Sequence, residues 1–424
     1  MQFASTNEGN TQLSYQPSVV LKCRAAICLS IVFALSSGCA PDQKPRAKRT
    51  MDQLIAARAA DDRQSNDDLD QSIDGVIARI KSDADAHADA HKASTAPSPV
   101  TADMLIISGG GDWGAFGAGF LKGWRTVHTG DMACPQFDVV TGVSTGALIA
   151  PFAFLGDDAS IDKVLNFYRN PKKDWVEPRH ILSFLRGGAS YADIPGLERD
   201  IKAALDPETV RRIAEQGNRG RILAVNTTNI DTAEARIFDV AKEARLAGPA
   251  GKSDRIEQIL LASSAIPGVF PPREIDGFLY VDGGITGNVL VGDPHVDTDS
   301  DGLIARWVQR YGKNTVPRVR YWIIFNNEVR WPPEVVAAKW TAVFGKSMTA
   351  STRSATLNSI RKLFLQADYL HAIFGADIEV RFVAVPDGWI PPKEGVFDKD
   401  TMNALANLGE KMGADPASWR TTAP

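Results

Sequence analysis

The chain has 424 residues, with 47 Lys and Arg against 51 Asp and Glu, which gives a formal net charge of −4. Without an excess of basic residues it has no general attraction for polyanions, so we expect no nucleic acid partner. The composition, 44% hydrophobic and 23% charged, is that of an ordinary globular protein.

The N-terminal part of the chain has the features of an export signal. Residues 25–35 are apolar and follow two basic residues, and this run is too short to span a bilayer. Small residues then lead to Cys39, which resembles the acylated cysteine of a bacterial lipoprotein, although Ser36 stands where such signals usually carry Leu. We therefore expect residues 1–38 to be a signal peptide and Cys39 to be a lipidation site on the membrane. Ala40 after the cysteine, by the same resemblance, indicates the outer membrane; the alternative is an unanchored periplasmic or secreted protein.

Residues 39–102 are predicted to form a lipid-anchored N-terminus and a flexible acidic spacer. Residues 51–100 contain ten Asp against five Lys and Arg, which is the composition of a solvated segment. Five apolar residues in this segment recur at helical spacing, so we expect one short amphipathic helix that docks on the main domain or lies in the membrane interface. These residues are Leu69, Ile73, Val76, Ile77 and Ile80.

The folded domain, predicted over residues 103–424, opens with a glycine loop between a strand and a helix. Residues 104–108 are an apolar run typical of a buried parallel strand, and a helix-forming segment follows the loop. Gly109, Gly110 and Gly111 leave backbone N–H groups free near a helix N-terminus, where an anion is stabilised. The anion is either the pyrophosphate of a dinucleotide, for which the expected acidic residue is poorly placed, or the oxyanion of a tetrahedral intermediate.

The next predicted strand ends in a G-x-S-x-G motif. Residues 137–141 form the strand, the motif contains Gly142, Ser144 and Gly146, and an apolar helix follows. Strand, tight turn and helix are the context of a nucleophile elbow, in which the glycines permit a strained turn that raises the serine hydroxyl above the sheet. We therefore predict that Ser144 is a catalytic nucleophile and that the glycine loop is its oxyanion hole.

A serine nucleophile needs a base, and a carboxylate has the better position. A predicted strand ends in Asp282, Gly283 and Gly284, so the carboxylate should lie at the edge of the sheet where the serine emerges. No histidine of the folded domain has a comparable setting. The alternative is an α/β-hydrolase-type serine esterase with His295 or His371 as the base.

These motifs together resemble the patatin-like phospholipases. The match consists of the glycine loop at 109–111, the elbow at 142–146, the Asp-Gly-Gly turn at 282–284 and the block at 262–272 that precedes it. The resemblance implies a Ser–Asp dyad without His and a phospholipase A or lysophospholipase activity on lipid esters. One departure is Trp113, since the family commonly has Arg or Lys at that position of the loop.

The resemblance implies a three-layer α/β/α fold with a mainly parallel central sheet. Residues 319–326 and 379–385 predict two more buried strands, and residues 399–412 predict a last helix. No cofactor and no metal are expected. Residues 297–302 begin like a calcium-binding loop, but Val308 stands where a bidentate Glu is required.

The role of one segment and the class of function both have open alternatives. The aromatic-rich residues 331–344 are either a lipid-facing lid or the packed part of a C-terminal helix. A third class of function is a membrane-anchored binding protein whose hydrolase site is vestigial.

Overall fold

The computed structural model describes residue 46 and residues 48–90, 100–179, 189–290 and 302–424. The chain divides into two compact units, residues 1–47 and residues 48–424, and the second unit holds nearly all of the described residues. The predicted signal peptide, Cys39, His295 and most of the 297–302 loop lie outside the described residues.

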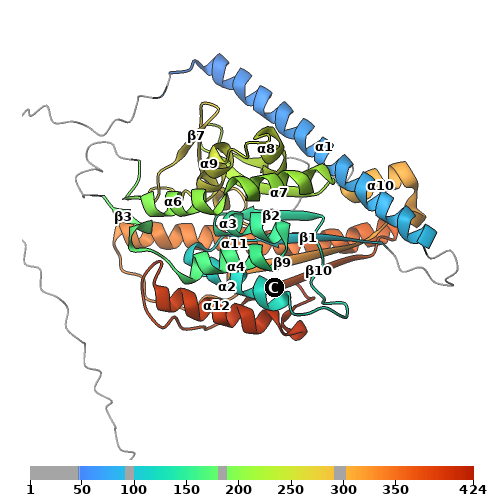
Figure 1. The fold of residues 1–424 in the computed structure, drawn as a ribbon. Coiled ribbons are helices and arrows are strands. Elements are labelled where there is room, and N and C mark those ends of the chain that lie inside the picture. Colours follow the sequence, from blue (N-terminus) through green and yellow to red (C-terminus); the bar gives the residue numbers. More distant parts are fainter. Residues whose placement is uncertain (1–45, 47, 91–99, 180–188, 291–301) are drawn as a thin grey trace, which may run out of the picture. The chain divides into compact units, whose positions relative to one another are not determined.

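Eight strands of the described chain form one sheet in the order β10-β9-β1-β2-β5-β8-β7, with β6 paired to the other edge of β5 (Figure 1). The strands β10, β9, β1, β2 and β5 are parallel, whereas β6 and β8 run antiparallel to β5, and β7 antiparallel to β8. The bounds are β1 (Thr101–Ile107), β2 (Val139–Val143), β5 (Ile222–Asn229), β6 (Glu234–Asp239), β7 (Arg273–Ile275), β8 (Phe278–Asp282), β9 (Arg318–Glu328) and β10 (Ile378–Val385). A separate antiparallel pair consists of β3 (Glu177–Pro178) and β4 (Ala192–Asp193).

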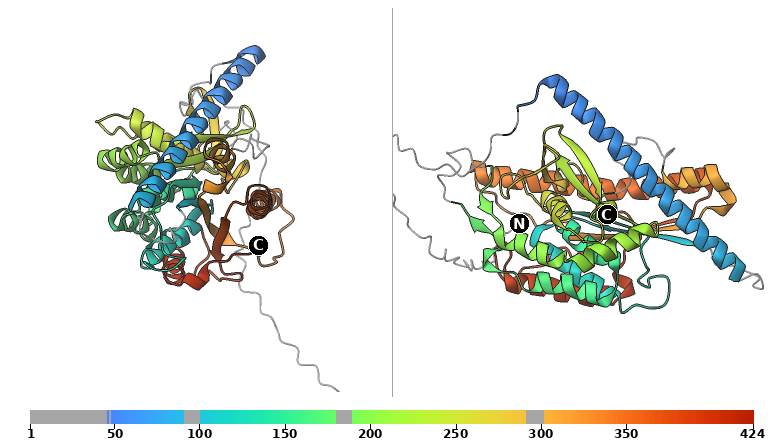
Figure 2. Two further views of the ribbon diagram at one scale, coloured as in Figure 1. Left: turned by 90° about the vertical axis from the view of Figure 1, so that its right-hand side faces the viewer. Right: turned by 45° about the horizontal axis from the view of Figure 1, so that its top comes forward.

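Helices cover both faces of this sheet, which makes three layers (Figure 2). One face carries α2 (Gly114–Trp124), α3 (Thr145–Leu155), α4 (Asp158–Arg169), α6 (Pro195–Ala204), α7 (Pro207–Asn218), α8 (Val240–Leu246), α9 (Asp254–Ser263) and α12 (Lys399–Gly413). The other face carries α1 (Met51–Ala90), α10 (Leu303–Tyr311) and α11 (Trp340–Phe374). The expected three-layer α/β/α fold with a mainly parallel sheet is confirmed.

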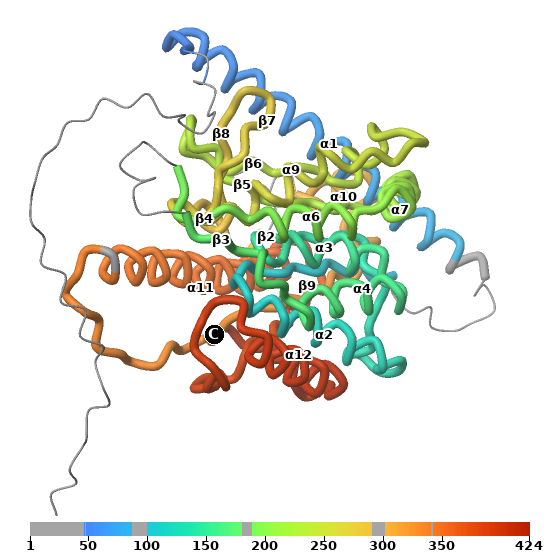
Figure 3. The backbone as a smooth tube through the Cα atoms, turned by 60° about the vertical axis from the view of Figure 1, so that its left-hand side comes forward, coloured from blue at the N-terminus to red at the C-terminus, as the bar shows by residue number. Residues whose placement is uncertain are grey.

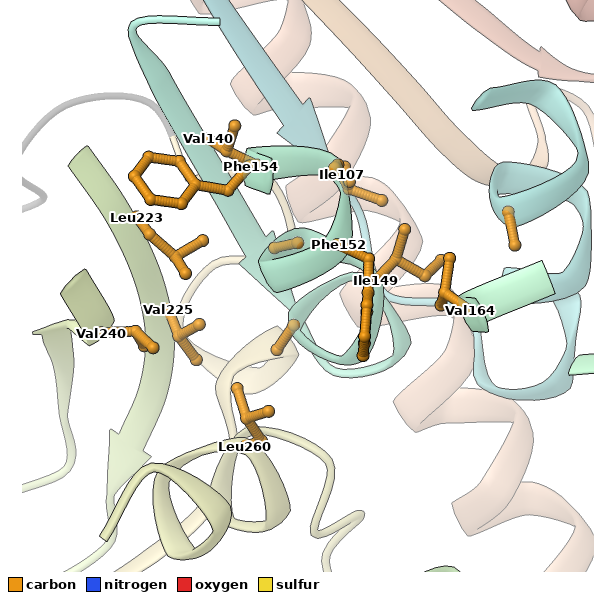
Figure 4. Packing of buried hydrophobic residues seen from close by; sticks show 14 of the residues in the cluster. Ile107, Val140, Ile149, Phe152, Phe154, Val164, Leu223, Val225, Val240 and Leu260 are labelled. Atoms are coloured by element: carbon orange, nitrogen blue, oxygen red, sulfur yellow. The ribbon is translucent and has the colours of Figure 1, made fainter. Parts of the chain in front are cut away.

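The core follows from the alternation of side chains along the buried strands. In β1, Leu105 and Ile107 pack with the larger layer of helices, while Met104 and Ile106 pack against the opposite layer. Figure 4 shows the larger cluster, in which Ile107 and other strand residues meet the phenylalanines of α3. Both faces of the sheet are therefore apolar, as the continuous runs in the sequence predicted.

The helix α1 differs from the expected short helix in a flexible spacer. It is 40 residues long and packs against the rest of the second unit through Val76, Ile77 and Ile80, which are at most 1% exposed. The acidic residues that suggested a solvated segment are partly used in ion pairs with distant basic residues. These pairs include Asp61–Arg236, Asp68–Lys242, Asp70–Arg306 and Asp74–Arg310.

Helices α2 and α12 pack with their backbones in contact. A Cβ atom built on Gly119 would lie 2.1 Å from the carbonyl oxygen of Ala406, and one on Gly409 would lie 2.1 Å from that of Phe116. Glycine at these positions permits the close approach. The contact fixes α2, and with it the glycine loop that precedes this helix.

In the described part of the chain, no helix is both long enough and apolar enough to cross a membrane.

Candidate active site

Strand β5 aligns the two residues predicted to be catalytic. Val143, the last residue of β2, pairs with Asn226 of β5, and Asp282, the last residue of β8, pairs with Thr227. Because β6 occupies the other edge of β5 over the same residues, β2 and β8 lie end to end along one edge. Ser144 follows β2 directly, so it lies opposite Asp282. The sequence predicted that Ser144 and Asp282 meet, because each stands at the end of a strand. The strand β8 runs antiparallel to β5, however, so it approaches the site from the direction opposite to β2.

The turn that carries Ser144 is strained. Its φ and ψ are 54° and −124°, a combination that L-residues rarely adopt. A Cβ atom on Gly142 would lie 2.4 Å from the carbonyl oxygen of Gly146, and a Cβ on Gly146 would lie 2.2 Å from that of Ile107. Only glycine fits at both motif positions, which is the geometry expected of a nucleophile elbow.

The side chain of Ser144 interacts with the carboxylate of Asp282 and lowers its pKa. Both residues are only 6% exposed. The N–H of Gly284 donates a hydrogen bond to Asp282 Oδ1, with an N···O distance of 2.7 Å. Burial raises the pKa of Asp282 to about 6, and the interactions with Ser144 and Gly284 oppose that rise only in part. The carboxylate is therefore a stronger base than an exposed aspartate, and it still ionises near neutral pH.

The glycine loop lies directly against the serine. A Cβ atom on Gly109 would lie 3.0 Å from the Cβ of Ser144. The N–H of Gly109, however, donates to Asn288 Oδ1 at 2.9 Å, and Asn288 Nδ2 donates to the hydroxyl of Thr356 at 3.0 Å. Gly109 therefore anchors the loop, and its N–H, one of the predicted oxyanion donors, is already paired with Asn288.

The remaining donors are Gly110, Gly111 and Thr145. Among the described residues, no hydrogen-bond acceptor is paired with the N–H of Gly110 or Gly111. Thr145 is the first residue of α3, and the first N–H groups of a helix have no partner within the helix. Thr145 adjoins the serine at the positive end of α3, and Gly110 and Gly111 follow Gly109, the loop residue that contacts the serine.

Two supporting residues were not predicted. The N–H of Ser144 donates to Ser263 Oγ at 2.9 Å, and the hydroxyl of Ser263 donates to the carbonyl oxygen of Asn226 at 2.7 Å. The side chain of Asn226 donates to the carbonyl oxygens of Gly283 and Gly287, at 2.9 and 3.0 Å. Ser263 lies in the 262–272 block that resembles the family, and the pair of serines at 263 and 264 was the available signal.

His371, one of the two alternative bases, does not reach the dyad. His371 lies in the last turn of α11, next to the start of β10, and its Nδ1 contacts the carbonyl oxygen of Ala376 at 2.9 Å. Since β10 is parallel to β2, this position is at the opposite edge of the sheet from Ser144. His371 therefore has no path to the serine hydroxyl.

No group of three or more His, Cys, Asp and Glu side chains in the described residues is arranged to hold a metal ion. The candidate site is made of one hydroxyl, one carboxylate and backbone N–H groups. These groups suffice for acyl transfer, because N–H donors can hold an oxyanion.

Trp113, which replaces the usual basic residue of the loop, joins an aromatic cluster. Its ring stacks on Trp331 with a centroid distance of 6.2 Å and meets Trp389 edge-on at 5.3 Å. Trp331 belongs to the aromatic-rich stretch, whose other large residues do not form a core: Trp340 is 78% exposed and Phe344 is 55% exposed. The packed-helix alternative is thus wrong for the first turns of α11.

Comparison with known proteins agrees with these motifs. A family model, patatin-like phospholipase, matches residues 105–294, a range that spans the glycine loop, the elbow and Asp282. This match indicates a lipid ester hydrolase. Among solved structures, the chain is similar to the crystal structure of VipD from Legionella pneumophila, at 12% identity over 76% of this chain and 68% of that chain, with a TM-score of 0.35.

Proposed function

We propose that the protein is a serine acyl-ester hydrolase of the phospholipase A or lysophospholipase type that uses Ser144 and Asp282 as a catalytic dyad. The observation that carries the proposal is the position of the strained, buried Ser144 beside Asp282, since β5 pairs with the last residues of both β2 and β8 and burial raises the pKa of the carboxyl to about 6. The family match over residues 105–294 supports a lipid ester as the substrate class.

The reaction begins with attack of Ser144 Oγ on the ester carbonyl carbon. The serine proton passes to Asp282 as the O–C bond forms, and the negative charge moves to the carbonyl oxygen. The N–H groups of Gly110, Gly111 and Thr145 are the donors available to stabilise that oxyanion, and loss of such a donor typically costs about 2.7–4 kcal/mol. The tetrahedral intermediate collapses to an acyl-enzyme, and the leaving alcohol takes the proton from Asp282.

Water completes the cycle through the same groups. Asp282 accepts a proton from a water molecule as that water attacks the acyl-enzyme carbonyl. Collapse of the second intermediate returns the proton to Ser144 Oγ and releases the fatty acid. No cation takes part in these steps, so a chelator should leave turnover of a soluble ester unchanged.

The test is hydrolysis of a soluble short-chain ester and of phospholipid by the wild-type chain and its variants. Ser144→Ala and Asp282→Asn should each lower kcat/KM by about 10³-fold or more, and the double variant should be little worse, because both groups act in one step. His371→Ala and His295→Ala should have small effects. A loss with either histidine change that equals the loss with Ser144→Ala would establish the alternative esterase mechanism. No turnover and no labelling of Ser144 by a fluorophosphonate would establish a vestigial site.

We also propose that the protein is located at the outer membrane. We expect Cys39 to carry the acyl chains of an outer-membrane lipoprotein, since more than one chain is needed for stable anchoring. Cys39→Ser should then release the protein from the membrane fraction in a high-salt wash, with hydrolysis of a soluble ester intact. Normal processing and retention of the Cys39→Ser protein would exclude the anchor.

A further inference from the structure

The first turns of α11 expose apolar side chains on one side. Trp340, Val343 and Phe344 are 78%, 50% and 55% exposed and have the i, i+3, i+4 spacing of a single helical side. Leu365 and Tyr369 are 68% and 50% exposed. At about 3.6 residues per turn, both follow Trp340 by nearly a whole number of turns, so they lie on the same side of the helix. The exposed side of α11 is therefore apolar at both ends.

This helix projects beyond the sheet at the edge that carries the dyad. It connects the parallel strands β9 and β10, so it begins at the carboxyl edge, where β2 ends in Ser144. Its 35 residues span about 52 Å, whereas the 11 residues of β9 span about 36 Å. Figure 3 shows the first turns of α11 extending past the strands, with the 331–339 loop beside them.

The same segment is basic. Residues 335–367 contain five Lys and Arg and no Asp or Glu, in a chain whose net charge is −4. Lys346 pairs with Glu334 at 2.7 Å and lies over the ring of Trp331, so it holds the loop against the helix. Lys339 and Lys362 are exposed, as is Arg361, whose Nε donates to the carbonyl oxygen of Pro424.

We infer that the exposed side of α11 docks on the surface of an anionic phospholipid bilayer. Apolar and aromatic side chains bordered by basic residues are the composition of helices that lie in a membrane interface. Basic residues near an anionic lipid surface raise affinity by about fivefold each. A second copy of the chain is a poorer partner, since it would bring an equally basic surface to this one. The inference rests on the proposed function, because the docked lipid would also supply the substrate ester.

Contacts link this surface to the active site. Thr356 of α11 accepts the hydrogen bond from Asn288 that holds the glycine loop, and Thr352 lies 3.5 Å from the position of a Cβ on Gly284. Docking of α11 therefore places the lipid against a helix whose buried side contacts the glycine loop and the turn after Asp282.

The experiment uses quenching of tryptophan fluorescence by brominated lipids. The full-length chain with Ser144→Ala, which cannot consume the lipid, is mixed with brominated vesicles of phosphatidylcholine alone or of phosphatidylcholine with phosphatidylglycerol. Residues 1–45 contain no Trp, so binding through the N-terminal segment gives no direct signal. Among the described tryptophans, Trp340 alone has an exposed side chain. Trp124, Trp175, Trp307 and Trp322 are at most 1% exposed.

We expect strong quenching with the anionic vesicles and little with phosphatidylcholine alone. Trp340→Phe should remove most of this quenching, and Val343→Ser with Phe344→Ser should weaken vesicle binding by about tenfold or more. Lys339→Gln with Lys362→Gln should lower the preference for anionic lipid. Leu246→Ser is the matched control, since Leu246 at the end of α8 is 71% exposed and should be neutral.

Equal quenching in the Trp340→Phe chain, or binding that ignores lipid charge and the Val343 and Phe344 changes, would overturn the inference. So would a change from dimer to monomer on Phe344→Ser without a change in vesicle binding, which would identify a surface between copies. With Ser144 intact, Phe344→Ser should leave hydrolysis of a soluble ester unchanged. Absence of hydrolysis in the wild-type chain would contradict the proposed function, while quenching of Trp340 would still establish the docking surface.

Discussion

The backbone N–H of Ser144 donates a hydrogen bond to the hydroxyl of Ser263, with an N···O distance of 2.9 Å. Ser263 is the last residue of α9 and is fully buried, and its hydroxyl donates in turn to the carbonyl oxygen of Asn226 in β5. The strained turn is thus tied to the strand that also pairs with Asp282. Ser263 does not touch the reacting atoms, so its role is to position the nucleophile.

Ser263→Ala should lower kcat by about tenfold to a hundredfold with little change in KM, because the turn loses the acceptor that holds Ser144. Fluorophosphonate labelling of Ser144 should slow by a similar factor. Ser263→Cys, which keeps a weak donor and acceptor, should recover part of the rate. The matched control is Ser264→Ala, since the buried hydroxyl of Ser264 has no hydrogen-bond partner among the residues that the structure describes. Equal losses of rate and of melting temperature in both variants would indicate a general packing effect.

The pKa of Asp282 predicts opposite effects of pH on rate and on stability. Turnover requires the carboxylate, so kcat/KM should rise with pH and reach half its maximum near pH 6. Between pH 3.8 and 6 the folded chain holds a proton on Asp282 that the unfolded chain has lost, so stability should fall as pH rises through this range. The raised pKa corresponds to about 3 kcal/mol of destabilisation above pH 6.

Asp282→Asn should therefore abolish most activity and raise the free energy of unfolding at pH 8, with the gain disappearing below pH 4. Denaturant unfolding at the two pH values measures both. A variant less stable than wild type at pH 8 would show that the carboxylate is not the destabilising group.

High salt should weaken the contacts of α1 with the rest of the chain more in the first half of the helix than in the second. Residues 58–74 are held by ion pairs, which include Asp68–Lys242 and Asp74–Arg310, and these are screened at high ionic strength. The later turns are held by the burial of Val76, Ile77 and Ile80, which salt does not weaken, and by the pair of Arg79 with the buried Asp138, which salt screens less than an exposed pair. Hydrogen exchange in 1 M NaCl, where the Debye length is about 3 Å, should speed up over residues 51–72 and change little over residues 76–80. Uniform exchange along α1 would contradict this division.

The parts of the site that the sequence predicted are those built from consecutive residues. The glycine loop follows β1 and the elbow follows β2, so strand, turn and helix signals at 104–124 and 137–155 were enough to find them. The sequence predicted that Ser144 and Asp282 lie close together. It did not predict that β8 runs antiparallel, because the direction of this strand depends on its pairing with β5. The ion pairs of α1 include residues 174 positions apart, Asp68 and Lys242, and 236 positions apart, Asp70 and Arg306, whereas composition alone indicated solvated aspartates.

Asn288 illustrates the same limit and leads to the last prediction. It lies six residues after Asp282, yet its Oδ1 accepts the N–H of Gly109 and its Nδ2 donates to Thr356 of α11. This amide therefore fixes the loop that presents the N–H groups of Gly110 and Gly111. No periodicity or spacing in the sequence relates these three elements.

Asn288→Leu should lower kcat by about 10- to 100-fold, less than the loss expected for removing Ser144, because the donors remain but are no longer held in place. Asn288→Asp should be at least as harmful, since a carboxylate beside the loop repels the oxyanion that forms there. Thr356→Val removes only the second contact of the amide, so its effect should be smaller than that of Asn288→Leu and in the same direction. Asn358→Ala, on the exposed side of α11, is the control and should be neutral. Rates of a soluble ester measured beside melting temperatures test this order, and a Thr356→Val variant with full activity would show that α11 does not help to hold the glycine loop.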